Sequence, residues 1–296
     1  MKTTQLAGIS VTEVLNSSFS IYLSNIGIFF PVFLALNLVN AALAKFALSF
    51  SPPFNPLNFP ADGSITQIIN YLVSLTPILS LTFLSSWILT NLGCGLAAKC
   101  AFDILEGRRV NLKSNLLLTF KSLGEILGVS FFTGILIISG IAILIVPGVI
   151  IAVIFSLSIP ALMYEQLGVF GSLKRSRELT DGAWWKTFLL LAATLALLIV
   201  AYLSAEIIAA VAIRQSAARI IAAIMVISFV EPIYPISISY FYHILRRRKS
   251  AYQPISREAA YPQRIQDMGV KVCYNCSQVL PYDAIYCPNC GLRVAY

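Results

Sequence analysis

Four cysteines near the C-terminus have the spacing of a metal site. Cys273 and Cys276 form one Cys-x-x-Cys pair, and Cys287 and Cys290 form a second. Each pair fits on one tight turn, and together the two turns offer four thiolate sulfurs to one tetrahedral ion, the closed shell of structural zinc. Gly291 suits a left-handed turn after the second pair, and the ten residues between the pairs suffice for one short hairpin. The spacing therefore predicts one zinc ion bound by these four cysteines.

The run Cys-Pro-Asn-Cys-Gly at residues 287–291 resembles the knuckle of the zinc ribbon family, and the resemblance covers residues 271–296. It implies a small β-hairpin module closed by one zinc ion. Zinc held by four thiolates has no open position for a substrate. We therefore expect a structural ion and not a catalytic one.

Catalytic groups are scarce in the rest of the chain. His243 is the only histidine, and it lies close to Arg246 at the end of an apolar segment. The sequence contains no GxSxG, HExxH or phosphate-binding glycine loop, and it offers no nucleophile with a neighbouring base. We expect that the protein is not an enzyme.

The composition is typical of a membrane protein. The chain has 296 residues, of which 58% are hydrophobic and only 11% are charged, and its mean hydropathy is +0.81. Soluble domains have about 45–50% apolar and about 25% charged residues. Apolar segments of about the length needed to cross a bilayer recur along the chain. They lie at residues 25–49, 70–101, 123–146, 149–167, 184–211 and 217–245.

These segments predict an all-α polytopic membrane protein with six transmembrane helices, interfacial amphipathic helices and a small C-terminal zinc ribbon. The expected divisions are a membrane domain at 1–249, a flexible linker at 250–270 and the ribbon at 271–296. Pro77 allows two interpretations of the second segment, a long kinked helix or an interfacial piece followed by a span.

Basic residues distinguish the two sides of the membrane. One set of loops carries fourteen of them: Lys2, Lys99, Arg108, Arg109, Lys113, Lys121, Lys174, Arg175, Arg177, Lys186, Arg246, Arg247, Arg248 and Lys249. The opposite set carries three: Lys45, Arg214 and Arg219. By the positive-inside rule both termini are cytoplasmic, and we expect a multi-pass protein of the cell membrane. The cysteines would then lie in a reducing compartment, which favours metal binding over disulfides.

The net charge of +8 does not indicate nucleic-acid binding. Most of the excess lies near the ends of the apolar segments, where it meets anionic lipid head groups. The ribbon segment has only Lys271 and Arg293 against Asp283, which is no basic stripe. We expect the lipid bilayer as a partner and no nucleic acid.

Three amphipathic stretches precede pairs of spans, at 11–24, 110–122 and 169–180. Leu15, Ser18, Phe19 and Gly27 recur 101 residues later as Leu116, Thr119, Phe120 and Gly128, and Leu173 and Ser176 follow the first two at a shift of 158. This pattern suggests a repeated unit of one interfacial helix and one two-span hairpin. Chance similarity among apolar helices is the competing explanation.

Residues 100–249 show a second likeness. Pro147-Gly148, Pro160, Glu165, the Ser-Leu-Lys-Arg-Ser-Arg-Glu-Leu run at 172–179 and the tryptophans after it resemble the membrane domain attached to some glycerophosphodiester phosphodiesterases and related six-span families. The resemblance implies a membrane-anchoring helical bundle. It does not imply the phosphodiesterase activity, since that belongs to a separate barrel that this chain lacks.

Lys174, Arg175 and Arg177 allow two interpretations. They could pair with Glu165 and Glu178 and hold an interfacial helix on the bundle, or they could contact phosphate in lipid head groups. Anchoring is the favoured interpretation.

Glu231 is the most unusual residue inside the apolar segments, because a carboxylate near mid-span is costly and Pro232 and Pro235 free backbone carbonyls beside it. With Tyr234 it is a candidate intramembrane functional site. The alternative is that Glu231 is protonated, or hydrogen-bonded to Tyr202, Tyr234 or a serine, and only joins helices. Glu206 is the other deep acid, and pairing with Arg214 or Arg219 would explain it.

Two functions fit these features. The first is a non-catalytic membrane scaffold or anchor whose cytosolic ribbon binds a protein partner. The second is a transporter or lipid-handling protein with its site at Glu231.

Overall fold

The computed structural model describes most of the chain. The described residues are 10–50, 65–212, 216–252, 270–273, 275, 276, 278–281 and 284–294. They form two compact units, 1–246 and 247–296, which are treated separately below. The predicted linker at 250–270 lies almost entirely outside the described residues.

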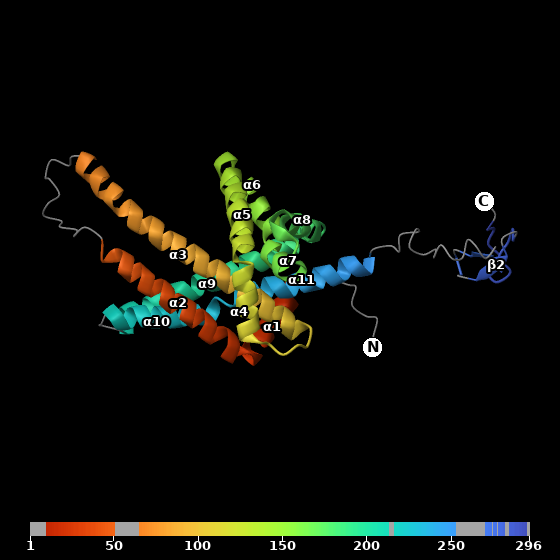
Figure 1. Cartoon of the computed structure of the whole chain (residues 1–296), viewed down its shortest axis with the longest axis horizontal. Coiled ribbons are helices and arrows are strands. Elements are labelled where there is room, and N and C mark those ends of the chain that lie inside the picture. The colour runs from red at the N-terminus through yellow and green to blue at the C-terminus, as the bar shows by residue number, and fades with distance from the viewer. Residues whose placement is uncertain are drawn as a thin grey trace. The chain divides into compact units, whose positions relative to one another are not determined.

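The first unit is helical and has the six predicted spans (Figure 1). The segments long and apolar enough to cross a membrane are Ile26–Leu48, Leu72–Leu105, Leu123–Ile143, Ile145–Glu165, Trp184–Ala205 and Ala218–Lys249. Many large apolar side chains on them point outward, with Phe83 72% and Ile143 76% exposed. Such surfaces suit lipid, where outward apolar groups carry no penalty. The fold is that of an all-α polytopic membrane protein.

The first and second spans are each one continuous helix, and both helices contain a proline. Helix α2 is Ile26–Leu48 with Pro31 inside it, and α3 is Ile65–Leu105 with Pro77 inside it. The second apolar segment therefore belongs to one long helix and is not an interfacial piece followed by a separate span. Figure 1 shows α2 and α3 as neighbours, and Ser86 in the middle of α3 donates to Asn40 of α2.

Two other spans are interrupted. The fourth consists of α6, Ile145–Phe155, and α7, Ser158–Glu165, and the sixth consists of α10, Ser216–Val230, and α11, Ile233–Tyr252. The third and fifth spans are the continuous helices α5, Leu123–Ile143, and α9, Trp184–Ala212. A proline lies near each break: Pro160 is inside α7, and Pro232 lies between α10 and α11. Each break exposes backbone groups that need partners from elsewhere in the bundle.

Three short helices correspond to the predicted amphipathic stretches: α1 is Val11–Ser24, α4 is Leu112–Lys121 and α8 is Gly168–Thr180. The element order is thus one short helix followed by a two-span hairpin, three times along the chain. The positions matched in the sequence, Ser18, Thr119 and Ser176, are all completely buried. One hydroxyl of each short helix therefore faces inward, whereas the matched Leu116 and Phe120 are 39% and 51% exposed, and the repeat stays a prediction.

The main core of the bundle lies where the short helices meet the ends of the spans. Phe102 of α3, Leu162 of α7, Leu179 of α8 and Tyr242 of α11 are at most 2% exposed and belong to one cluster. The rings of Phe102 and Tyr242 meet edge to face with centroids 5.8 Å apart. A second cluster around Tyr22 and Phe33 joins α1 and α2 to α3.

The second unit contains a two-stranded antiparallel sheet. Strand β1, Val270–Val272, pairs with β2, Val279–Pro281, with Val272 opposite Val279. Isolated bridge pairing also joins Tyr286 to Arg293. The expectation of a hairpin between the two cysteine pairs is wrong, because β1 precedes the first pair. Each pair instead lies at the end of its own hairpin, which lets both turns face one point.

Candidate functional sites

The four cysteine sulfurs of the second unit converge. All four lie within 4.8 Å of one another. The Sγ of Cys273 is 3.5 Å from that of Cys290, and the Sγ of Cys276 is 3.5 Å from that of Cys287. These four cysteines are free thiols, as expected. The group can hold a metal ion.

The two cysteine turns share one backbone pattern. The amide of Cys273 donates to the carbonyl of Gln278, and the amide of Cys287 donates to the carbonyl of Leu292, both at 2.8 Å. Gly291 follows the second pair with φ of +69°, the left-handed conformation that the sequence predicts for it. Two turns of the same geometry thus present two sulfurs each.

Hydrogen bonds favour the thiolate form of Cys276 and Cys290, whereas burial raises the pKa of the Cys287 thiol to about 11. The backbone amide of Leu292 and the side chain of Asn275 lower the pKa of the Cys290 thiol to about 6. The backbone amide of Gln278 and the side chain of Asn289 lower the pKa of the Cys276 thiol. The two asparagines occupy the same place in their pairs, and each serves a cysteine of the opposite pair. Their side chains orient the sulfurs that would bind the ion.

The sulfur positions fit a tetrahedral ion. A metal–sulfur bond of about 2.3 Å requires neighbouring sulfurs about 3.8 Å apart, whereas a disulfide requires about 2 Å. The two contacts at 3.5 Å match the first value and exclude the second. The buried side chains of Leu280 and Val294 pack with Cys273 and Cys287 in one small core. Four thiolates in this arrangement leave no position for a substrate.

Glu231 lies at the break between α10 and α11 and is hydrogen-bonded. The side-chain nitrogen of Asn37 on α2 donates to its Oε2 at 2.8 Å and lies 3.1 Å from the hydroxyl oxygen of Ser228. Asn40, one turn further along α2, accepts from Ser86 of α3 at 2.9 Å. The sequence suggests a serine as a possible partner of Glu231 but does not reveal Asn37. The signal was available, since Asn37 and Asn40 are the asparagines of an otherwise apolar span.

The space beside Glu231 is small. A cavity of about 10 Å³ is lined by the carboxylate and by residues of α2 and α3, among them Phe33, Asn37 and Thr90. This volume is about that of one water molecule. The backbone amide of Tyr234 donates to the carbonyl of Glu231 at 3.3 Å, and the Tyr234 ring packs against the main core. Tyr202 is 52% exposed and points away. The side chain of Glu206 and all of Arg214 lie outside the described residues.

The three basic residues of α8 separate into two groups. Arg175 is half-buried and pairs with Glu165 at 3.1 Å and with Glu178 at 3.4 Å. Glu165 also accepts from Tyr242 at 2.6 Å and pairs with Arg246 at 3.3 Å. Arg175 therefore joins α8 to α7 and α11, which agrees with the anchoring interpretation.

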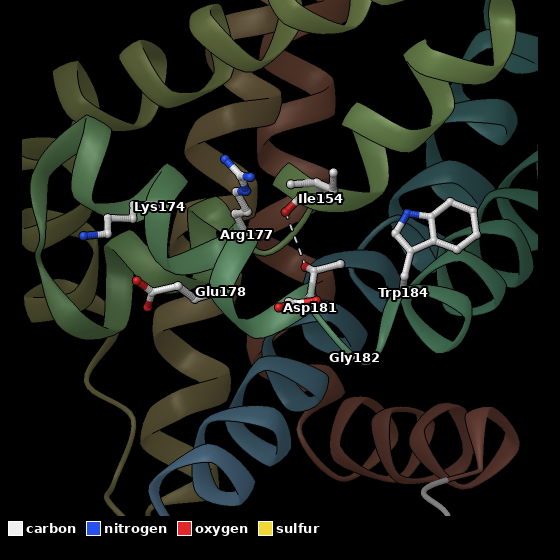
Figure 2. A pocket seen from close by; sticks show the side chains of 8 residues that line it. Ile154, Lys174, Arg177, Glu178, Asp181, Gly182 and Trp184 are labelled. Atoms are coloured by element: carbon white, nitrogen blue, oxygen red, sulfur yellow. Dashed lines mark hydrogen bonds between the residues drawn. The ribbon is translucent and has the colours of Figure 1, made fainter. Parts of the chain in front are cut away.

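Lys174 and Arg177 differ from Arg175. Both are exposed, and neither makes an ion pair or a side-chain hydrogen bond with the described residues. They line a pocket of about 470 Å³ together with Glu178, Asp181 and Trp184 (Figure 2). The sequence placed the three cations in one group because helical periodicity alone does not show which face meets the bundle.

The hydroxyl of Ser176, one of the positions matched in the sequence repeat, helps to hold helix α8 in the bundle. Ser176 donates to the carbonyl of Ile154 at 2.6 Å and accepts from the amide of Leu157 at 3.2 Å. Both backbone groups are released by the break between α6 and α7. Ser176 of α8 therefore provides hydrogen-bond partners for the backbone groups at the break in the fourth span.

No family model, curated protein or solved structure matches the chain. The likeness of residues 100–249 to the membrane domain of some glycerophosphodiester phosphodiesterases gains no support from these comparisons and stays a prediction.

Proposed function

We propose that the protein is a non-catalytic scaffold or anchor of the cell membrane, with both termini in the cytoplasm. Its C-terminal ribbon would bind one structural zinc ion and dock a cytosolic protein. The observation that carries the proposal is the convergence of four cysteine sulfurs within 4.8 Å in a unit with its own small core. Thiolate ligands in this number and spacing favour zinc.

The ribbon surface supports a protein partner. Val279, Ile285 and Tyr286 are 59%, 54% and 61% exposed, so the short module presents three large apolar side chains on its surface. If they form one contiguous patch, such a patch would suit a protein partner. The described part of the ribbon carries little charge, so the proposal does not extend to nucleic acid.

The test uses the full-length protein, purified from native membranes after mild cross-linking and compared with two variants by mass spectrometry. Cys287→Ser should remove both the zinc and the co-purified partner. Ile285→Asp should keep the zinc and lose the partner, which separates recognition from folding of the module. Cys94→Ser, which removes a thiol from α3, is the matched control. An identical set of partners in all four proteins would contradict the proposal.

Transport or lipid handling at Glu231 is the second candidate function. The observation in its favour is the helix break at Glu231 and Pro232, because interrupted spans place backbone carbonyls and acids at binding sites of transporters. The cavity of about 10 Å³ and the bond from Asn37 favour a joint between helices instead.

Glu231→Gln distinguishes the two roles. A glutamine oxygen still accepts from Asn37, so a purely structural Glu231 tolerates the change with less than about 0.5 kcal/mol lost, whereas Glu231→Leu should cost about 1 kcal/mol. A proton- or cation-binding role requires the carboxylate. Loss of ion-dependent uptake in proteoliposomes with Glu231→Gln, at unchanged stability, would support transport and count against the scaffold as a complete account.

A further inference from the structure

The pocket beside α8 is lined by charged side chains of both signs. Lys174 and Arg177 contribute two positive charges, and Glu178 and Asp181 contribute two negative ones. Lys174 and Glu178, and likewise Arg177 and Asp181, are four residues apart on the chain, a spacing at which helical ion pairs form. Neither of these two pairs closes to within 4.0 Å, and the ion pairs that the structure does contain nearby belong to Arg175. Glu178 pairs with Arg175, so the charges that remain available at the pocket wall are those of Lys174, Arg177 and Asp181.

An aromatic ring completes the lining. Figure 2 shows Trp184 across the pocket from Lys174 and Arg177, with Asp181 between them. The face of a tryptophan attracts an ammonium group. The buried indole nitrogen of Trp184 has no hydrogen-bond partner among the described residues. Asp181 and the indole of Trp184 thus lie at one end of the pocket, and Lys174 and Arg177 lie at the other, beside Glu178, which Arg175 neutralises.

The pocket lies beside the first residue of a membrane-spanning helix. Trp184 begins a membrane-spanning helix, and the neighbouring Trp185 is 69% exposed, as in the aromatic belts of membrane proteins. The carbonyl of Ile154, in the interrupted fourth span, forms the inner end of the pocket. Its volume of about 470 Å³ falls within the usual range of ligand pockets, about 300–1,000 Å³.

We propose that this pocket binds a phosphate ester that carries an ammonium group, supplied by a zwitterionic phospholipid such as one with an ethanolamine head group. Lys174 and Arg177 hold the phosphate oxygens, while Asp181, beside the indole of Trp184, holds the ammonium. The indole itself is fixed by Phe188, whose ring stacks on it with centroids 5.5 Å apart. An anionic lipid suits the pocket less well, because Asp181 opposes a second negative charge. Arg175 takes no part, since its guanidinium is occupied by Glu165 and Glu178.

The test measures lipid binding to delipidated full-length protein in detergent by native mass spectrometry. The probes are short-chain phosphatidylethanolamine, short-chain phosphatidylglycerol and soluble phosphoethanolamine. Lys174→Gln with Arg177→Gln should weaken binding of the ethanolamine lipid about 25-fold, about fivefold for each cation. Lys113→Gln with Lys121→Gln, which removes two exposed cations of α4, is the control and should leave binding unchanged.

Asp181→Asn tests the other end of the pocket. It should weaken the ethanolamine lipid about fivefold and leave the glycerol lipid unaffected or slightly strengthened, so the preference between the two is lost. Phosphoethanolamine that binds as tightly as the lipid would identify a soluble ligand of the same chemistry. Equal binding of the lipid by the pocket variant and the control variant, or a stronger affinity for the glycerol lipid than for the ethanolamine lipid, would overturn the proposal.

Discussion

Replacement of Ser176 by alanine should destabilise the bundle more than any other change of a single oxygen atom in α8. The hydroxyl is completely buried and bridges two backbone groups freed by the break in the fourth span, the carbonyl of Ile154 and the amide of Leu157. Thr180 also donates to the carbonyl of Ile154, at 3.3 Å, so that group keeps a partner in the variant. The amide of Leu157 keeps none.

The expected cost follows from this difference. A buried amide left without an acceptor costs about 1–3 kcal/mol, so Ser176→Ala should lose about 2 kcal/mol of unfolding free energy. Adding Thr180→Val leaves the carbonyl without a side-chain partner as well and should raise the loss to about 3–4 kcal/mol.

Ser172→Ala is the matched control. Ser172 lies one turn earlier on α8 and is also completely buried, but its hydroxyl donates only to the carbonyl of Gly168 in its own helix, at 2.6 Å. Removing such a bond should change the stability by less than about 0.5 kcal/mol. Reversible unfolding in mixed detergent micelles, followed by circular dichroism, measures both variants. Equal stability of Ser176→Ala and Ser172→Ala would refute the argument that α8 repairs the broken span.

Two further predictions concern the metal site and the contact between α5 and α6. Cys276→Ser and Cys287→Ser should each abolish stoichiometric zinc while membrane insertion and bundle helicity are kept, because the ion stabilises only the small C-terminal module; elemental analysis and circular dichroism measure both. Gly140→Ala should cost about 1–3 kcal/mol in micelle unfolding, since its Cβ would lie 2.8 Å from the backbone of Gly148, whereas Gly134→Ala, with nothing within 4 Å, should be neutral or slightly stabilising.

The sequence predicts the architecture well because hydropathy and helical periodicity are local signals. Six spans, three short amphipathic helices and the four converging cysteines all appear at nearly the predicted residues. The repeat, which rested on six matched positions, corresponds to buried hydroxyls at Ser18, Thr119 and Ser176.

The features that the sequence does not reveal depend on contacts between distant segments. Asn37 meets Glu231 across 194 positions of the chain, and Ser176 meets Ile154 only because the fourth span breaks. Composition also treats Lys174, Arg175 and Arg177 alike, whereas Glu165 draws only Arg175 toward the bundle. The position of the ribbon hairpin relative to the cysteine pairs is not predicted correctly either, because cysteine spacing defines the ligands but not the strands that flank them.

The most direct test of a zinc-bearing membrane scaffold is X-ray absorption at the zinc edge on the purified full-length protein. We expect one zinc ion per chain with four sulfur neighbours at about 2.3 Å. A protein purified without zinc, a shell that contains nitrogen or oxygen ligands, or an unchanged spectrum in Cys276→Ser and Cys287→Ser would contradict the account.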